Sequence, residues 1–240
     1  MKPWLKYLLI ALGAIAVLLS FPAYYLYGEF SKAASEDPVV WESDIRALEQ
    51  TTRGPPGSVL FIGSSSIRLW DSLAQDMLPM TTIRRGFGGA KMADTVYYAQ
   101  RLVDIEQPAA IVIFVGTNDI HPGEVKEPEV LLQSYQRLVA EIRGVHSLTP
   151  IFYIAITPSV MRWEIWPVAQ ETNRLIAQYS ATDTALHFID TGPALMHSGR
   201  PGKQFYRRDG LHLSEAGYQV WTDIIRARLL EVTPALNAPR

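Results

Sequence analysis

The sequence predicts an α/β protein in which a five-stranded parallel sheet lies between two layers of helices, a three-layer α/β/α sandwich. Two observations predict this class. From residue 58 onward short apolar runs alternate with helical patterns, which is typical of strand–helix–strand units. Several of these runs are apolar at every position, as expected for strands that helices cover on both faces. The expected strands are 59–62, 81–83, 110–115, 151–156 and 186–189.

The chain begins with an uncharged stretch over residues 7–27. At about 1.5 Å per helical residue this stretch spans roughly 31 Å, which matches the hydrocarbon thickness of a bilayer. We therefore expect an N-terminal transmembrane helix within residues 1–30 that anchors the protein in a membrane. Lys2 and Lys6 precede the stretch, so the positive-inside rule places the rest of the chain extracytoplasmic, in the periplasm or on the cell surface.

A cleaved signal peptide is the alternative, with a poor small-x-small site at residues 31–33. Residues 31–57 predict a polar linker and a first helix, because apolar residues recur at helical spacing until Gly and Pro interrupt the chain. Residues 58–233 form the predicted main domain, and 234–240 a short tail. The further expected helices are 67–77, 93–105, 128–145, 168–179 and 214–230.

The composition excludes several classes of site. The formal net charge is -2 and the sequence has no run of Lys and Arg. Both observations argue against a nucleic-acid-binding surface. The basic pairs 84–85 and 207–208 are interpreted as surface charges. The chain has no cysteine, which excludes disulfides, thiolate catalysis and cysteine-ligated zinc. We expect no metal ion, because no metal-ligand spacing relates His121, His146, His187 and His197.

Four glycine-rich or polar segments follow predicted strands or precede the last helix, namely 63–66, 85–89, 116–119 and 209–214. Because the carboxyl ends of parallel strands meet at one edge of a sheet, we expect these segments to share a rim. The first segment, Gly-Ser-Ser-Ser, lies between a strand and a helix. One of its three serines is therefore well placed to attack a substrate.

The last segment can supply a base and the group that orients it. His212 follows Asp209 by three residues, directly before a helix start, so one turn can present both side chains on the same side. His212 would take the proton of a serine hydroxyl and return it to the leaving group, while Asp209 would hold the imidazole tautomer. The structural alternative is that Asp209 caps a loop and His212 packs on the last helix.

Acyl transfer also needs donors for the developing oxyanion. Gly88 and Gly89 allow the backbone to approach a ligand closely, and Asn118 places a side-chain amide at a strand end. With the backbone N–H of the nucleophile these groups make three donors. Each signal alone is weak, because Gly-Gly is usually a turn and Asn-Asp a loop or cap.

The chain resembles the SGNH hydrolases, also called the GDSL esterase/lipase family. The four blocks of that family match 61–65, 86–89, 116–119 and 209–214 in order. The resemblance implies a flavodoxin-like five-stranded sheet and no metal or cofactor. It implies a catalytic triad of Ser65, Asp209 and His212. It also implies that the Ser65 and Gly89 N–H groups and Asn118 Nδ2 form the oxyanion hole.

Two positions depart from the pattern of the family. The usual Gly-Asp-Ser is Gly63-Ser64-Ser65 here, so the acidic neighbour of the nucleophile is missing. That residue is not normally in the triad, and counting from Gly63 selects Ser65 over Ser64 and Ser66. Arg84 stands where many members have Asn. The α/β-hydrolase fold is a poorer match, because its elbow needs Gly-x-Ser-x-Gly and residue 67 is Ile.

Aromatic side chains near the same rim are candidates for substrate binding. Two tryptophans lie in the segment after the fourth strand, where they can stack on a sugar or line an acyl pocket; packing against the sheet edge is the alternative. The candidates are Phe87, His121, Trp163, Trp166 and Tyr206.

These observations predict a serine esterase that hydrolyses a carboxylic ester through an acyl-enzyme. A short acyl ester on a carbohydrate or lipid would suit an extracytoplasmic location. An acyltransferase with the same acyl-enzyme and a non-catalytic envelope-binding module on the same fold are the alternatives.

Overall fold

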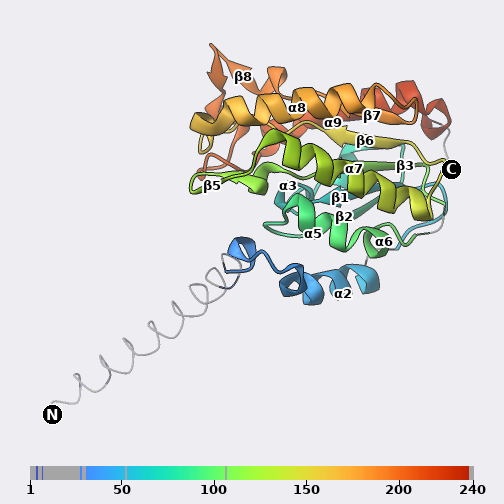
Figure 1. The fold of residues 1–240 in the computed structure, drawn as a ribbon, viewed down its shortest axis with the longest axis horizontal. Coiled ribbons are helices and arrows are strands. Elements are labelled where there is room, and N and C mark those ends of the chain that lie inside the picture. The colour runs from blue at the N-terminus through green and yellow to red at the C-terminus, as the bar shows by residue number, and fades with distance from the viewer. Residues whose placement is uncertain are drawn as a thin grey trace.

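A computed structural model describes residues 4, 7, 28, 31–51, 53–105 and 107–237. Its centre is a parallel five-stranded sheet with the strand order β2-β1-β3-β6-β7 (Figure 1). The strands are β1 Val59–Gly63, β2 Thr82–Gly86, β3 Ala110–Phe114, β6 Ile151–Ile154 and β7 Leu186–Ile189. Each overlaps an expected strand, so the predicted parallel sheet is confirmed.

Helices cover both faces of the sheet and make the three predicted layers. One face packs against α2 Glu42–Thr51, α5 Met92–Tyr97, α6 Ala99–Leu102, α7 Pro128–Val145 and α8 Trp166–Ser180. The other packs against α3 Ser65–Arg68, α4 Leu73–Asp76 and α9 Glu215–Val232. The described part of the chain also contains the 3-10 helices η1 Pro38–Trp41, η2 Thr117–Asp119, η3 Trp163–Ile165, η4 Pro193–Leu195, η5 Lys203–Phe205 and η6 Pro234–Asn237. Two short hairpins lie in the same described part, β4 Ile120–His121 with β5 Glu124–Val125 and β8 Met196–His197 with β9 Arg200–Pro201.

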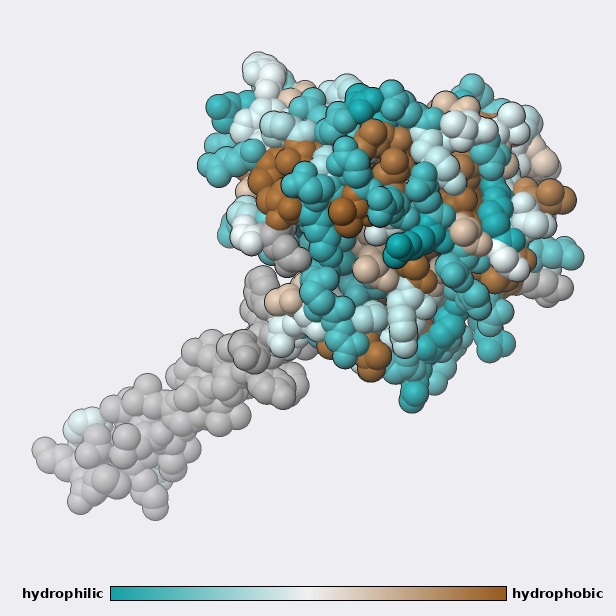
Figure 2. Space-filling model, in the orientation of Figure 1, coloured by the Kyte–Doolittle hydropathy of each residue, from teal (hydrophilic) through white to brown (hydrophobic). Residues whose placement is uncertain are grey.

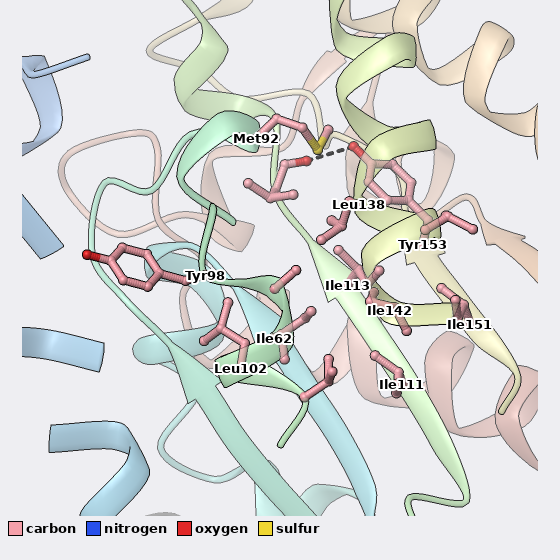
Figure 3. Close-up of a cluster of buried hydrophobic side chains, with 14 of the residues drawn as sticks. Ile62, Met92, Tyr98, Leu102, Ile111, Ile113, Leu138, Ile142, Ile151 and Tyr153 are labelled. Atoms are coloured by element: carbon pink, nitrogen blue, oxygen red, sulfur yellow. Dashed lines mark hydrogen bonds between the residues drawn. The ribbon is translucent and has the colours of Figure 1, made fainter. Parts of the chain in front are cut away.

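The central strands contribute side chains to two hydrophobic cores, one on each face of the sheet, because successive strand side chains point to opposite faces. In β1, Leu60 and Ile62 belong to one cluster of buried side chains, whereas Phe61 belongs to the cluster on the other face. Figure 3 shows the first cluster, in which strand residues meet Leu138 and Ile142 of α7. Burying one such side chain contributes about 1.5–3 kcal/mol, so the sheet is fixed from both faces.

The helix predicted over 67–77 is two short helices, α3 and α4. Trp70 lies between them, fully buried, and its indole packs against Phe61 and Trp221. Its Nε1 donates to the Asp76 carboxylate at 2.6 Å. We attribute the break to this packing, which draws the chain toward the sheet. Figure 2 shows a largely hydrophilic surface on this view of the domain, with hydrophobic residues in small separate groups.

The predicted fold class needs one correction, because it included an N-terminal transmembrane helix. Among the described residues no helix has the length and apolar character needed to cross a membrane. Residues 7–27, to which that helix was assigned, lie outside the described residues except for Tyr7. The extracytoplasmic location that depended on the same stretch stays a prediction.

Candidate active site

The site begins at the tight turn between β1 and α3. Gly63 has a φ of 141°, and a Cβ there would lie 2.0 Å from the Phe114 carbonyl oxygen, so only glycine fits. The next N–H, that of Ser64, donates to the same oxygen at 3.0 Å. This turn places Ser65 at the carboxyl end of β1 as the first residue of α3.

The Ser65 hydroxyl lies at one end of a chain of hydrogen bonds. Ser65 Oγ is 3.0 Å from His212 Nε2, and His212 Nδ1 is 2.8 Å from Asp209 Oδ2. A carboxylate can only accept, so Nδ1 carries a proton and Nε2 is left to accept from the serine. The structure thus brings the three predicted triad residues together, from the turn after β1 and the turn before α9.

The Asp209 carboxylate is held by its own turn. Asp209 Oδ1 accepts from the N–H groups of Leu211 at 2.9 Å and His212 at 3.0 Å. Burial raises the pKa of Asp209, but the hydrogen bonds from the His212 side chain and these two backbone groups lower it further, and the net shift is downward. The carboxylate is therefore ionised at neutral pH, as the orienting role predicted for it requires.

The neighbouring serines are buried. Ser64 is 1% exposed and Ser66 8%, and the Ser66 carbonyl accepts a hydrogen bond from Tyr218 Oη at 2.9 Å. Within the described part of the chain, Ser65 is the serine whose hydroxyl contacts His212.

The predicted oxyanion donors lie on two adjoining loops. Asn118 follows Gly116, whose φ of 116° turns the chain at the end of β3, and its Nδ2 donates to the Ala90 carbonyl at 3.1 Å. This contact brings the Asn118 amide beside the loop that carries Gly89, and the second Nδ2 hydrogen remains for a ligand. No acceptor among the described residues takes the N–H of Gly89, and the N–H of Ser65 starts a helix and so has no intrahelical partner.

Arg162 holds Asn118 in this orientation, and sequence reasoning missed it. Its Nη2 lies 3.3 Å from Asn118 Oδ1, and its Nη1 donates to the Thr117 carbonyl. Because a guanidinium only donates, it selects the oxygen of the amide and leaves the nitrogen facing Ala90. Burial lowers the pKa of Arg162 to about 10, so the group stays charged at neutral pH.

Asp119 fixes the same two loops to each other. It is 3% exposed, and its Oδ2 accepts from the N–H of Met92 at 2.8 Å. Burial raises its pKa to about 6, against the bond from Met92 and the charge of Lys126. The residue belongs to a predicted block, but the sequence carried no signal of this contact.

The segment before the main domain packs on the loop after β2. Trp41 meets Phe87 edge to face with ring centroids 5.6 Å apart. Gly89 has a φ of 68°, and a Cβ there would lie 2.7 Å from Ala33 Cβ. Lys91, 2% exposed, donates from Nζ to the Ser35 carbonyl at 3.0 Å and to the Glu36 carboxylate. Phe87, Gly89 and Lys91 therefore all lie against residues 33–41.

Two of the predicted substrate-binding residues lie in the core. Phe87 is 1% exposed and packs between Trp41 and Tyr98. Tyr206 is 6% exposed, and its hydroxyl donates to the Pro158 carbonyl. Phe87 therefore belongs to the core, whereas the small exposed part of Tyr206 lines a surface groove.

The other three predicted residues are partly accessible. Trp163 and Trp166 stack with ring centroids 6.4 Å apart and an angle of 16°. Trp166 also lines a small pocket together with Thr117 and Arg162, next to Asn118. His121 lies in the β4–β5 hairpin with Nδ1 3.1 Å from the Pro122 carbonyl. In the described ranges no group of three His, Asp or Glu could hold a metal ion.

Known proteins resemble this chain in family and fold. The family description that matches residues 53–220 is the GDSL-like Lipase/Acylhydrolase family, whereas no curated protein matches the chain. Among solved structures, a protein from Streptococcus pneumonia provisionally described as a platelet activating factor has a TM-score of 0.70 at 21% identity, covering 89% of this chain and 99% of that chain. A GDSL-like lipase from Bacteroides thetaiotaomicron has a TM-score of 0.60 at 18% identity, covering 81% and 98%.

At these identities the solved structures establish the fold alone. The family match adds the identity, because it covers more than half of the sequence and contains all four blocks. The chain therefore belongs to the GDSL-like lipase/acylhydrolase family of ester hydrolases.

Proposed function

We propose that this protein is a serine esterase in which Ser65 attacks a carboxylic ester and forms an acyl-enzyme. The observation that carries the proposal is the unbroken relay from Asp209 through His212 to Ser65 Oγ, with contacts of 2.8 and 3.0 Å. A base within hydrogen-bond reach of the hydroxyl activates an otherwise weak nucleophile.

The reaction follows from the placement of these groups. Ser65 Oγ attacks the carbonyl carbon while His212 Nε2 takes the hydroxyl proton. The N–H groups of Ser65 and Gly89 and the Nδ2 group of Asn118 stabilise the oxyanion. His212 then gives its proton to the alcohol oxygen as the ester C–O bond breaks. Water, deprotonated by the same imidazole, releases the carboxylic acid and restores Ser65.

The absence of the usual acidic neighbour does not disturb this relay. Ser64 replaces it and is buried, with its N–H on the Phe114 carbonyl. Asp209 supplies the carboxylate that His212 needs.

Labelling of the full chain with a fluorophosphonate, followed by mapping of the modified peptide, tests the proposal. Ser65→Ala should abolish labelling and lower kcat on an aryl acetate by roughly 10⁴-fold or more. Ser64→Ala and Ser66→Ala are the matched controls and should still be labelled at Ser65. Labelling that survives in Ser65→Ala would refute the assignment, and a folded wild type that takes no label would favour a non-catalytic binding module.

A further inference from the structure

A groove of about 420 Å³ lies beside the turn that carries the candidate base. Its volume is in the range of sites that hold part of a small-molecule ligand. The groove is lined by Val160, Lys203, Tyr206, Arg207, Arg208 and Gly210.

The wall of this groove is the backbone of the catalytic turn itself. Gly210 lies between Asp209 and His212 in the chain, and the Arg207 N–H donates to the His212 carbonyl at 2.7 Å. On the facing side, the Met161 N–H donates to the Gly210 carbonyl at 2.9 Å. A group bound in the groove would therefore lie next to the loop that positions the imidazole.

Three cationic side chains line the groove, whereas the neighbouring carboxylate, Asp209, is engaged by His212. Lys203, Arg207 and Arg208 are exposed, and in the described part of the chain none of them forms an ion pair with a carboxylate. Arg207 is partly engaged, because its Nε donates to the Leu213 carbonyl at 3.1 Å. The whole chain has a formal charge of -2, so this concentration is local and favours an anion.

The position of the groove indicates which half of an ester it would receive. The leaving alcohol takes its proton from His212 Nε2, so the alcohol must lie against the loop of His212. Two of the proposed oxyanion donors lie on different loops: the Asn118 side chain on the loop after β3, and the Gly89 N–H on the loop after β2. A groove that shares the His212 loop therefore belongs to the alcohol.

We infer that this groove binds an anionic group, a phosphate or a carboxylate, on the alcohol part of the ester substrate. The inference rests on the proposed esterase function, because it assigns the alcohol by the direction of proton return. Lysine and arginine donate charge-assisted hydrogen bonds to both kinds of anion. Val160, 38% exposed, offers an apolar contact for the carbon atoms next to the charge.

Three aryl acetates that differ only in a distant substituent test the inference. Their rings carry, through a methylene, a carboxylate, a phosphate or a neutral carboxamide, so the leaving groups are closely matched. We expect kcat/KM to be about tenfold higher for an anionic ester than for the carboxamide, and this ratio to fall as salt is added. The carboxylate and phosphate esters together identify which anion is preferred.

The double variant Lys203→Gln with Arg208→Gln should bring the ratio close to one. Arg228→Gln is the matched control, since it removes a cation from α9 that pairs with Glu231 away from the groove. An unchanged ratio in the double variant, or an equal loss of kcat/KM for all three esters, would overturn the inference. If the wild type hydrolyses none of the three esters and takes no fluorophosphonate, the proposed function fails instead.

Discussion

Lys91 Nζ donates a hydrogen bond to the carboxylate of Glu36, and this ion pair joins the segment before the main domain to the loop that carries Gly89. The two partners differ in burial, because the lysine side chain is 2% exposed and the glutamate side chain 55%. The Ser35 carbonyl is the other acceptor on Nζ, at 3.0 Å. Removing one partner therefore has a different consequence from removing the other.

Glu36→Ala should destabilise the protein more than Lys91→Met. The first leaves a buried ammonium with a carbonyl as its remaining partner, which costs about 2–3 kcal/mol. The second leaves a carboxylate that water can reach, and the methionine fills much of the same volume, so we expect about 1 kcal/mol or less. Urea denaturation of the two variants measures the difference.

A second ion pair on the N-terminal segment gives the control for Glu36→Ala. Glu49 pairs with Arg101 at 2.7 Å, and Arg101 keeps Glu42 as another partner. Glu49→Ala should cost under about 1 kcal/mol, since both side chains are about one-third exposed. Equal losses for Glu36→Ala and Lys91→Met would contradict the role of burial at this contact.

The strands and the order of the site segments were predictable because their signals are local. A strand covered on both faces is apolar at every position, and 59–62 shows this within four residues. Asp209 and His212 lie three residues apart, so one turn brings them together. Sequence reasoning could also place Ser65 between a strand and a helix.

The remaining contacts join residues that are far apart in the chain. Arg162 lies 44 positions from Asn118, and Lys91 lies 55 from Glu36. A single sequence contains no pattern that relates such pairs, because neither strand nor helix periodicity extends across the loops between them. The pair 207–208 is exposed, as predicted. The groove beside it could not be predicted, because it forms only where the folded chain brings Val160 and Lys203 next to the pair.

Arg162→Lys should lower kcat about tenfold with little change in KM. A lysine cannot hold both the Thr117 carbonyl and the Asn118 Oδ1 with a planar fork, so the amide would leave its donor position part of the time. Losing such a donor outright, as in Asn118→Ala, should cost about 10²–10³ in kcat. Steady-state kinetics on an aryl acetate separates kcat from KM.

Arg174→Lys provides the comparison for Arg162→Lys. Arg174 pairs with Glu171 on the exposed surface of α8, and we expect its substitution to leave kcat within about twofold of the wild type. If Arg162→Lys raises KM and leaves kcat intact, the guanidinium binds substrate rather than orienting Asn118.

Gly89→Ala should lower both stability and kcat. A φ of 68° is strained for alanine by about 1 kcal/mol, and the new Cβ would lie 2.7 Å from Ala33 Cβ. The loop must then move, and with it the N–H that we propose as an oxyanion donor. We expect a loss of kcat of roughly 10²-fold, measured together with urea denaturation.

Gly199→Ala is the control that separates backbone strain from the steric contact with Ala33. Its φ is 76°, and a Cβ there would have no neighbour within 4 Å, so Gly199→Ala carries the backbone cost with no displacement of the loop. It should lose about 1 kcal/mol and keep its kcat. Adding Ala33→Gly to Gly89→Ala should restore part of the lost kcat, and a double variant no faster than the single one would show that Ala33 does not displace the loop.

Asp119 should make stability fall as the pH rises from about 4 to about 6. Its pKa in the folded protein is about 6 against an ordinary value of 3.8, so the folded state binds more protons than the unfolded state in this window. The free energy of unfolding therefore decreases as Asp119 ionises, by about 3 kcal/mol for the whole difference between the two pKa values. Burial dominates, with Asp94 adding to the shift and Lys126 and the Met92 N–H opposing it.

Asp119→Asn should remove this part of the pH dependence. Its carbonyl oxygen can still accept from the Met92 N–H, and it carries no charge to bury. In urea denaturation between pH 4 and pH 7, the stability of the variant relative to wild type should rise with pH. Asp223→Asn, which changes an aspartate on α9 that is 63% exposed, serves as the control. A difference between Asp119→Asn and wild type that stays constant over this range would mean that Asp119 ionises at the same pH in both the folded and the unfolded chain.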